Sequence, residues 1–151
     1  MKKFSTLRWW IILPIYVLVD VLATGAGMGV PFFCILLGFP VGWFLARRHL
    51  LSSNEIGQVL KKTLRDSLIA SGITFVGMTG LWLPAAAEFF HPGANIRNFG
   101  IPMILYEPLP SFVSWLALMI IISPFLQLLA AVFASFLTVM RRTARHETNQ
   151  G

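Results

Sequence analysis

The chain has 151 residues, of which 56% are hydrophobic and only 12% are charged. Soluble domains average about 45–50% apolar and about 25% charged residues, so a soluble fold would leave large apolar patches in water. The formal net charge of +6 could indicate a protein that binds nucleic acid. The basic residues, however, lie in short clusters between apolar runs, a pattern typical of membrane proteins. The composition predicts an all-α integral membrane protein in a lipid bilayer, with no nucleic acid as partner.

The apolar stretch from Trp9 to Ala46 predicts the first two membrane crossings. Asp20 is its only charged residue, and the stretch is too long for one crossing because about 20 residues span the hydrocarbon. Three glycines and a proline at residues 25–31 mark a turn. We therefore expect helices over residues 9–25 and 30–46. A cleavable signal peptide ending near residue 25 is an alternative, although Asp20 and Pro14 argue against it.

A basic segment, residues 47–66, follows the second predicted crossing. Ser52 and Glu55 have capping-box spacing, and an apolar stripe at helical spacing comes next, made of Ile56, Val59, Leu60, Leu64 and Leu68. The basic residues lie largely off this stripe, so we expect a short amphipathic cytoplasmic helix in the lipid interface. A soluble loop helix and an extension of the third crossing are the alternatives.

Two further apolar runs predict the third and fourth crossings, over residues 67–88 and 112–140. The segment 89–111 between them contains four prolines and is interpreted as an extracytoplasmic loop. The fourth run is longer than a bilayer requires, so we expect it to be tilted, bent at Pro124 or extended beyond the membrane. The whole chain, residues 1–151, is thus expected to form one membrane domain, a four-transmembrane-helix bundle.

The basic residues predict the orientation of this bundle. Eleven of the twelve lysines and arginines fall on one side of a four-crossing arrangement, and only Arg97 falls on the other. Cytoplasmic loops carry the excess of Lys and Arg. We therefore expect both termini in the cytoplasm, with the protein in the plasma (inner) membrane.

Asp20 is the residue that we single out as a candidate functional group. Counting from Arg8 at 1.5 Å per residue places it ~18 Å above the cytoplasmic interface, where a carboxylate costs at least ~2.5–3.5 kcal/mol. The same count places Thr79, Gln127 and Cys34 at similar depths, ~18–21 Å. We expect Asp20, Thr79 and Gln127 to form an intramembrane polar site. The alternative is structural, with Asp20 capping the turn at 25–29 or hydrogen-bonded to Thr79 or Gln127.

The predicted outer loop contains a second polar cluster, composed of Glu88, His91, Arg97 and Glu107. Glu88 and His91 have the Glu-x-x-His spacing of metal ligands on one helix face, but a di-metal site needs two such pairs. We expect no metal here and interpret the cluster as an ion-pair network that fixes the loop.

Small residues predict close helix contacts. Gly38 and Gly42 have the GxxxG spacing that lets two helix backbones approach, and the pairs Ala130–Ala134 and Ala131–Ser135 repeat this spacing on the fourth crossing. We expect these residues to pack the chain on itself, and docking of another subunit is the alternative.

The sequence lacks Walker A, dinucleotide-binding, zinc-protease and nucleophile-elbow signatures, so we expect no cofactor and no catalytic residues. Our first hypothesis is a non-catalytic accessory or structural subunit that packs against partner membrane chains or self-associates. The alternative is a small transporter or channel subunit that uses the polar site around Asp20. A lipid-modifying enzyme that uses Glu88, His91 and Arg97 is the third hypothesis.

Overall fold

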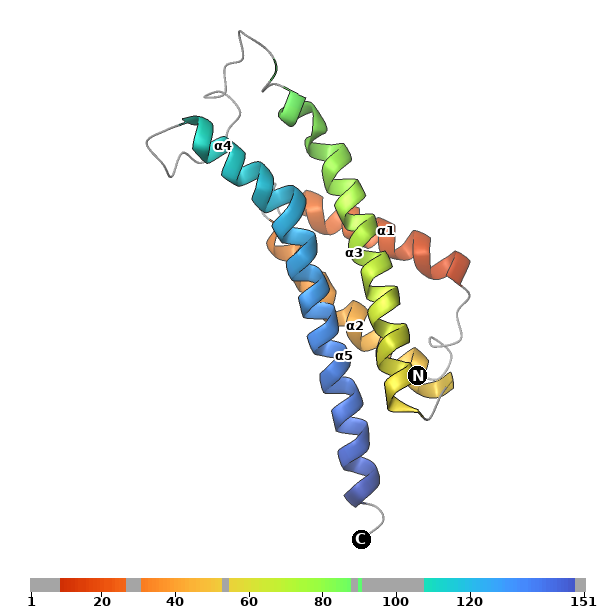
Figure 1. Cartoon of the computed structure of the whole chain (residues 1–151). Coiled ribbons are helices and arrows are strands. Elements are labelled where there is room, and N and C mark those ends of the chain that lie inside the picture. Colours follow the sequence, from red (N-terminus) through yellow and green to blue (C-terminus); the bar gives the residue numbers. More distant parts are fainter. Residues whose placement is uncertain (1–8, 27–30, 53–54, 88–89, 91–107, 149–151) are drawn as a thin grey trace.

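The computed structural model describes residues 9–26, 31–52, 55–87, 90 and 108–148, and the long elements within these ranges are all helices (Figure 1). They are α1 (Trp9–Ala26), α2 (Phe32–Ser52), α3 (Ile56–Ala87), α4 (Pro108–Ala117), the π-helical segment η4 (Leu118–Ile122) and α5 (Ser123–Thr148). Three segments are long and apolar enough to cross a membrane: Phe32–Ser52, Ile56–Pro84 and Leu109–Ala144. The chain is therefore an all-α protein with the helices of an integral membrane protein. The apolar stretch of α1, Ile11–Ala23, is shorter than these three segments and is not counted with them.

The contact between α2 and α5 is the most extensive in the bundle, and glycines make it possible. A Cβ added to Gly38 would lie 2.8 Å from the Ala130 Cβ, and one added to Gly42 would lie 2.7 Å from the Ala131 Cα. Ordinary carbon contacts are about 3.5–4.0 Å, so only glycine fits at either position. Gly38 and Gly42 thus pack within the chain, against α5.

Helix α3 begins earlier than the sequence suggested. It is continuous from Ile56, so residues 47–66 are shared between the end of α2 and the first turns of α3 rather than forming a separate helix. In these first turns Val59, Thr63 and Asp66 are buried, whereas Leu64 is exposed. The inward face is therefore largely polar, and it holds the segment against the bundle.

The fourth apolar run forms one long helical path, from Pro108 to Thr148, interrupted by η4. The Ser123 N–H donates to the Leu118 carbonyl, five residues back, which is the hydrogen bond of a π-helix. Pro124 follows directly and has no N–H to continue the α-helical pattern. The proline thus explains why the wider turn lies at this point in the helix.

Helix α1 lies across the other helices in Figure 1 and packs against α2 and α3. Most of its apolar side chains are exposed; they include Ile11, Leu13, Ile15, Val17, Leu18, Val19, Val21 and Leu22. In contrast, Asp20 is only 7% exposed. Asp20 therefore points into the protein, whereas most of the apolar side chains of α1 point outward, as expected for a helix in lipid.

Basic residues gather where α2 ends, α3 begins and α5 ends. Arg142 donates a hydrogen bond to the Leu50 carbonyl, and His49 Nε2 lies 2.9 Å from Asp66 Oδ2. Arg47 lies over the Trp43 ring, 4.7 Å from its centroid, within the range of a cation–π contact. One end of the bundle thus carries the basic residues that flank these three helices.

Candidate intramembrane polar site

A hydrogen-bonded network connects α1, α3 and α5 inside the bundle. The Gln127 side-chain amide donates to the Tyr16 hydroxyl over 3.0 Å, and this hydroxyl lies 2.6 Å from Thr74 Oγ1. The Thr74 hydroxyl in turn donates to Asp20 Oδ2 over 2.9 Å. Asp20, Thr74 and Gln127 are 7%, 1% and 3% exposed, whereas Tyr16 is partly exposed.

The donors of this network can follow one direction. A Tyr or Thr hydroxyl donates one hydrogen and accepts others, so Gln127 can donate to Tyr16, Tyr16 to Thr74, and Thr74 to Asp20. Asp20 is then the final acceptor. The Tyr16 hydroxyl also lies 3.0 Å from the Ala70 carbonyl, which is a second acceptor for its proton. Tyr16 can therefore donate to either of two groups on α3.

A second polar contact joins α3 to α5 one turn away from Thr74. The Ser71 hydroxyl donates to the Pro124 carbonyl over 2.7 Å. Close by on α5, Ser123 Oγ and Gln127 Oε1 are buried and make no hydrogen bond within the described ranges. A buried polar atom without a partner costs about 1–3 kcal/mol and commonly marks a place for water or an ion. The site therefore has unused oxygen atoms facing the protein interior.

Of the three residues predicted for this site, Asp20 and Gln127 belong to the network and Thr79 does not. The Thr79 hydroxyl donates to the Phe75 carbonyl of its own helix over 2.8 Å. Thr79 follows Thr74 by five residues, which turns it about 140° around the helix. It therefore lies on a different face of α3 from the one that meets Asp20.

Tyr16 and Thr74 are the members of the site that the sequence reasoning missed, although the sequence carried signals for both. Tyr16 precedes Asp20 by four residues and so shares its helix face. Thr74 ends a series of buried hydroxyl residues on α3 that are three or four residues apart: Thr63, Ser67, Ser71 and Thr74. Such spacing marks one helix face, and this face is the polar one.

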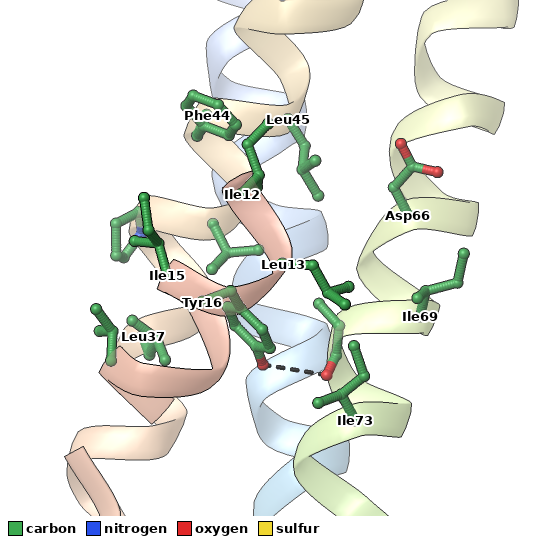
Figure 2. Close-up of a pocket in the computed structure, with 14 residues that line it drawn as sticks. Ile12, Leu13, Ile15, Tyr16, Leu37, Phe44, Leu45, Asp66, Ile69 and Ile73 are labelled. Atoms are coloured by element: carbon green, nitrogen blue, oxygen red, sulfur yellow. Dashed lines mark hydrogen bonds between the residues drawn. The ribbon is translucent and has the colours of Figure 1, made fainter. Parts of the chain in front are cut away.

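A cavity of about 290 Å³ lies beside the network, between α1, α2 and α3. Figure 2 shows Tyr16 extending from α1 toward α3 at this cavity, with its hydroxyl bonded to Ala70. Nearly all of the lining side chains are apolar, among them Ile12, Leu13, Leu37, Phe44, Ile69 and Ile73; Asp66 is an exception. Helix α1 borders this cavity and is joined to α3 beside it by the hydrogen bond of Tyr16.

Cys34, which the depth count placed near the polar site, is buried in a neighbouring apolar cluster. It packs with Met78 of α3 and Met119 of η4, and Ala23, Trp82 and Trp115 border this cluster. Ala23 follows Asp20 by one turn of α1, so the cluster and the polar network are adjacent along that helix.

The predicted outer cluster of Glu88, His91, Arg97 and Glu107 lies outside the residues that the structure describes. Its interpretation as an ion-pair network therefore stays a prediction. Among the described ranges, no group of three or more His, Cys, Asp or Glu side chains is placed to hold a metal ion.

The chemistry of the polar network follows from its one ionisable acid. A carboxyl group inside a bilayer either keeps its proton or needs a cation to balance it. The hydroxyls of Tyr16 and Thr74 can stabilise either form of Asp20, because each can donate or accept a hydrogen bond. The arrangement can therefore bind and release a proton or a small cation. No family model, curated protein or solved structure was found to match this chain.

Proposed function

We propose that this chain is a small membrane transporter or channel subunit that binds a proton or a small cation at the polar network around Asp20. The observation that carries the proposal is the buried Asp20 carboxylate at the end of the hydrogen bonds from Gln127, Tyr16 and Thr74. Intramembrane acids are costly and usually mark an ion pathway or a proton relay. The unused oxygens of Gln127 and Ser123 offer further ligands for a cation or a water molecule.

The packing of α1 supports a transport role over a fixed structural one. Tyr16 and Asp20 of the network lie on α1. This helix borders the apolar cavity and contacts its neighbours less extensively than α2 contacts α5. Transport requires two arrangements of a site, open to opposite sides of the membrane. A displacement of α1 along the cavity would separate Asp20 from Thr74 without disturbing the glycine contact at Gly42.

The proposal includes four crossings with both termini in the cytoplasm. Helix α1 has 18 residues and is ~27 Å long, so it spans most of the ~30 Å hydrocarbon core only if it turns from its transverse position in Figure 1 toward the axes of the other helices. The basic ends of α2, α3 and α5 lie together, and Lys2, Lys3 and Arg8 join them only if α1 also crosses.

Cysteine labelling tests this arrangement. In a Cys34→Ala background, cysteines at Ser5 and Asn54 should be labelled from one face of the membrane and a cysteine at Asn95 from the other. Labelling of Ser5 from the face of Asn95 would contradict the crossing by α1.

Flux through proteoliposomes tests the transport function. The purified chain, reconstituted into vesicles that contain a dye sensitive to H⁺, Na⁺ or K⁺, should dissipate an imposed gradient of the ion that the dye reports. Asp20→Asn should reduce this flux at least about tenfold, because a neutral amide can neither release a proton nor balance a cation, and a loss of ~1.4 kcal/mol in binding is already tenfold. Thr79→Val is the matched control and should keep the flux, because within the described part of the chain the Thr79 hydroxyl bonds to the Phe75 carbonyl of its own helix. An unchanged flux in Asp20→Asn, with both variants folded, would remove Asp20 from the mechanism.

An accessory subunit that packs against partner membrane chains is the second candidate, in which a partner helix would replace lipid on the exposed apolar side chains of α1. Gly38 and Gly42, for which docking of another subunit was the alternative, pack within the chain, against α5. The composition of the particle extracted from native membranes in mild detergent tests this candidate. Other chains at a fixed stoichiometry would support it. A particle of this chain alone would favour transport.

A further inference from the structure

We propose that Cys34, Met78 and Met119 form a binding site for Cu(I), a soft monovalent cation. Three separate segments, α2, α3 and η4, each supply one sulfur-containing side chain, and the three pack together in one cluster. Their exposed fractions are 0%, 2% and 0%. Thiolate and thioether sulfurs are soft ligands that favour Cu(I), Zn²⁺ and iron–sulfur clusters over hard cations.

Sulfur-containing residues gather in this cluster. Of the methionines in the described ranges, Met78 and Met119 are buried and Met140 is 53% exposed. The two buried methionines therefore share one cluster with the only cysteine of the chain. Methionine has three rotatable bonds and adapts to its surroundings, so the two thioethers have conformational freedom to approach a bound ion.

The position of Met119 adds a second observation. Met119 lies in η4, where the π-helical turn places an additional residue in the helix before Ser123. Single π-helical turns are frequently found at functional sites. Met119 in this turn packs against Cys34 and Met78.

The charge of the site suits its apolar surroundings. On binding, Cu(I) replaces the thiol proton of Cys34, and the proton leaves to the solvent. The product combines one positive charge with one thiolate and is neutral, which avoids the large cost of an isolated charge in an apolar interior. Trp82 and Trp115, which pack against the cluster with ring centroids 4.2 Å apart, supply aromatic rings that also favour a neighbouring cation.

Divalent hard cations are poor candidates for the same position. Mg²⁺ and Ca²⁺ require several oxygen ligands, and the cluster offers sulfur and aromatic carbon. Zn²⁺ prefers four ligands from Cys, His and carboxylates, whereas the cluster supplies one of these. The proposal is independent of the transport function, because it concerns different side chains from the network around Asp20.

A competition titration tests the site in the purified full-length protein. Under anaerobic conditions with ascorbate, Cu(I) is titrated into the protein in detergent against bicinchoninate, a coloured Cu(I) chelator. We expect one tightly bound Cu(I) per chain. Met78→Leu and Met119→Leu should each weaken binding at least about tenfold, a loss that even disturbance of a ligand's surroundings produces, and Cys34→Ser should weaken it further. Met140→Leu is the matched control and should bind as the unmodified chain does.

Leucine is chosen for the variants because it has nearly the volume of methionine and is usually tolerated in its place. Size-exclusion chromatography checks that every variant is folded. X-ray absorption of the Cu(I) complex, repeated with Ag(I) as a probe without redox chemistry, should show sulfur ligands only. Three results would overturn the proposal: no bound Cu(I), nitrogen or oxygen ligands, or equal affinity in the folded Met78→Leu/Met119→Leu double variant and the unmodified chain.

Discussion

Gly42→Ala should weaken the bundle, because it places a methyl group against the backbone of α5. The added Cβ would lie 2.7 Å from the Ala131 Cα, about 1 Å closer than carbon atoms ordinarily approach. A backbone atom cannot rotate away, so α2 and α5 would have to separate by about this distance along their main contact. Overpacking of this kind costs about 1–3 kcal/mol. We therefore expect Gly42→Ala to lower the free energy of unfolding by about 2 kcal/mol.

Gly77→Ala on α3 is the matched control, because a Cβ added there has nothing within 4 Å. This variant gains up to about 1 kcal/mol of helix propensity and should be neutral or slightly stabilised. Both variants can be compared by pulse proteolysis along an SDS titration. Equal midpoints for Gly42→Ala and Gly77→Ala would refute the reasoning. They would mean that the α2–α5 contact is not as close as the structure places it.

Two further substitutions test the polar contacts by the same unfolding measurement. Tyr16→Phe removes the hydroxyl that joins Gln127 to α3 and should destabilise the protein by about 0.6–1.7 kcal/mol, the range for hydrogen bonds between membrane helices. Thr79→Val should change little, and an equal effect of the two would contradict the network. His49→Ala removes a partner 2.9 Å from Asp66, whose side chain is 2% exposed, and should cost about 1–3 kcal/mol. Stability equal to that of the unmodified chain would show that this pair does not hold α2 to α3.

The sequence by itself determined the class of protein and much of its helix layout. Apolar runs of about 20 residues are readable without a structure, because the hydrocarbon thickness sets their length. It also singled out Asp20, since a carboxylate within such a run is conspicuous, and it marked Gly38 and Gly42 as close-contact residues. Helix boundaries were harder: the basic residues near Lys61 and Lys62 suggested an interfacial segment, whereas α3 begins at Ile56 and continues without a break.

Only the tertiary structure decided which polar residues meet. Counting depth along each helix gives a height above the membrane surface but not the rotation of the helix, and a rotation of about 100° per residue moves a side chain to another face. Thr79 was therefore predicted at a suitable height but lies away from Asp20, whereas Thr74 bonds to it. The cluster of Cys34, Met78 and Met119 likewise depends on the packing of three separate segments. Residues far apart in the sequence meet through side-chain packing, which no single helix specifies.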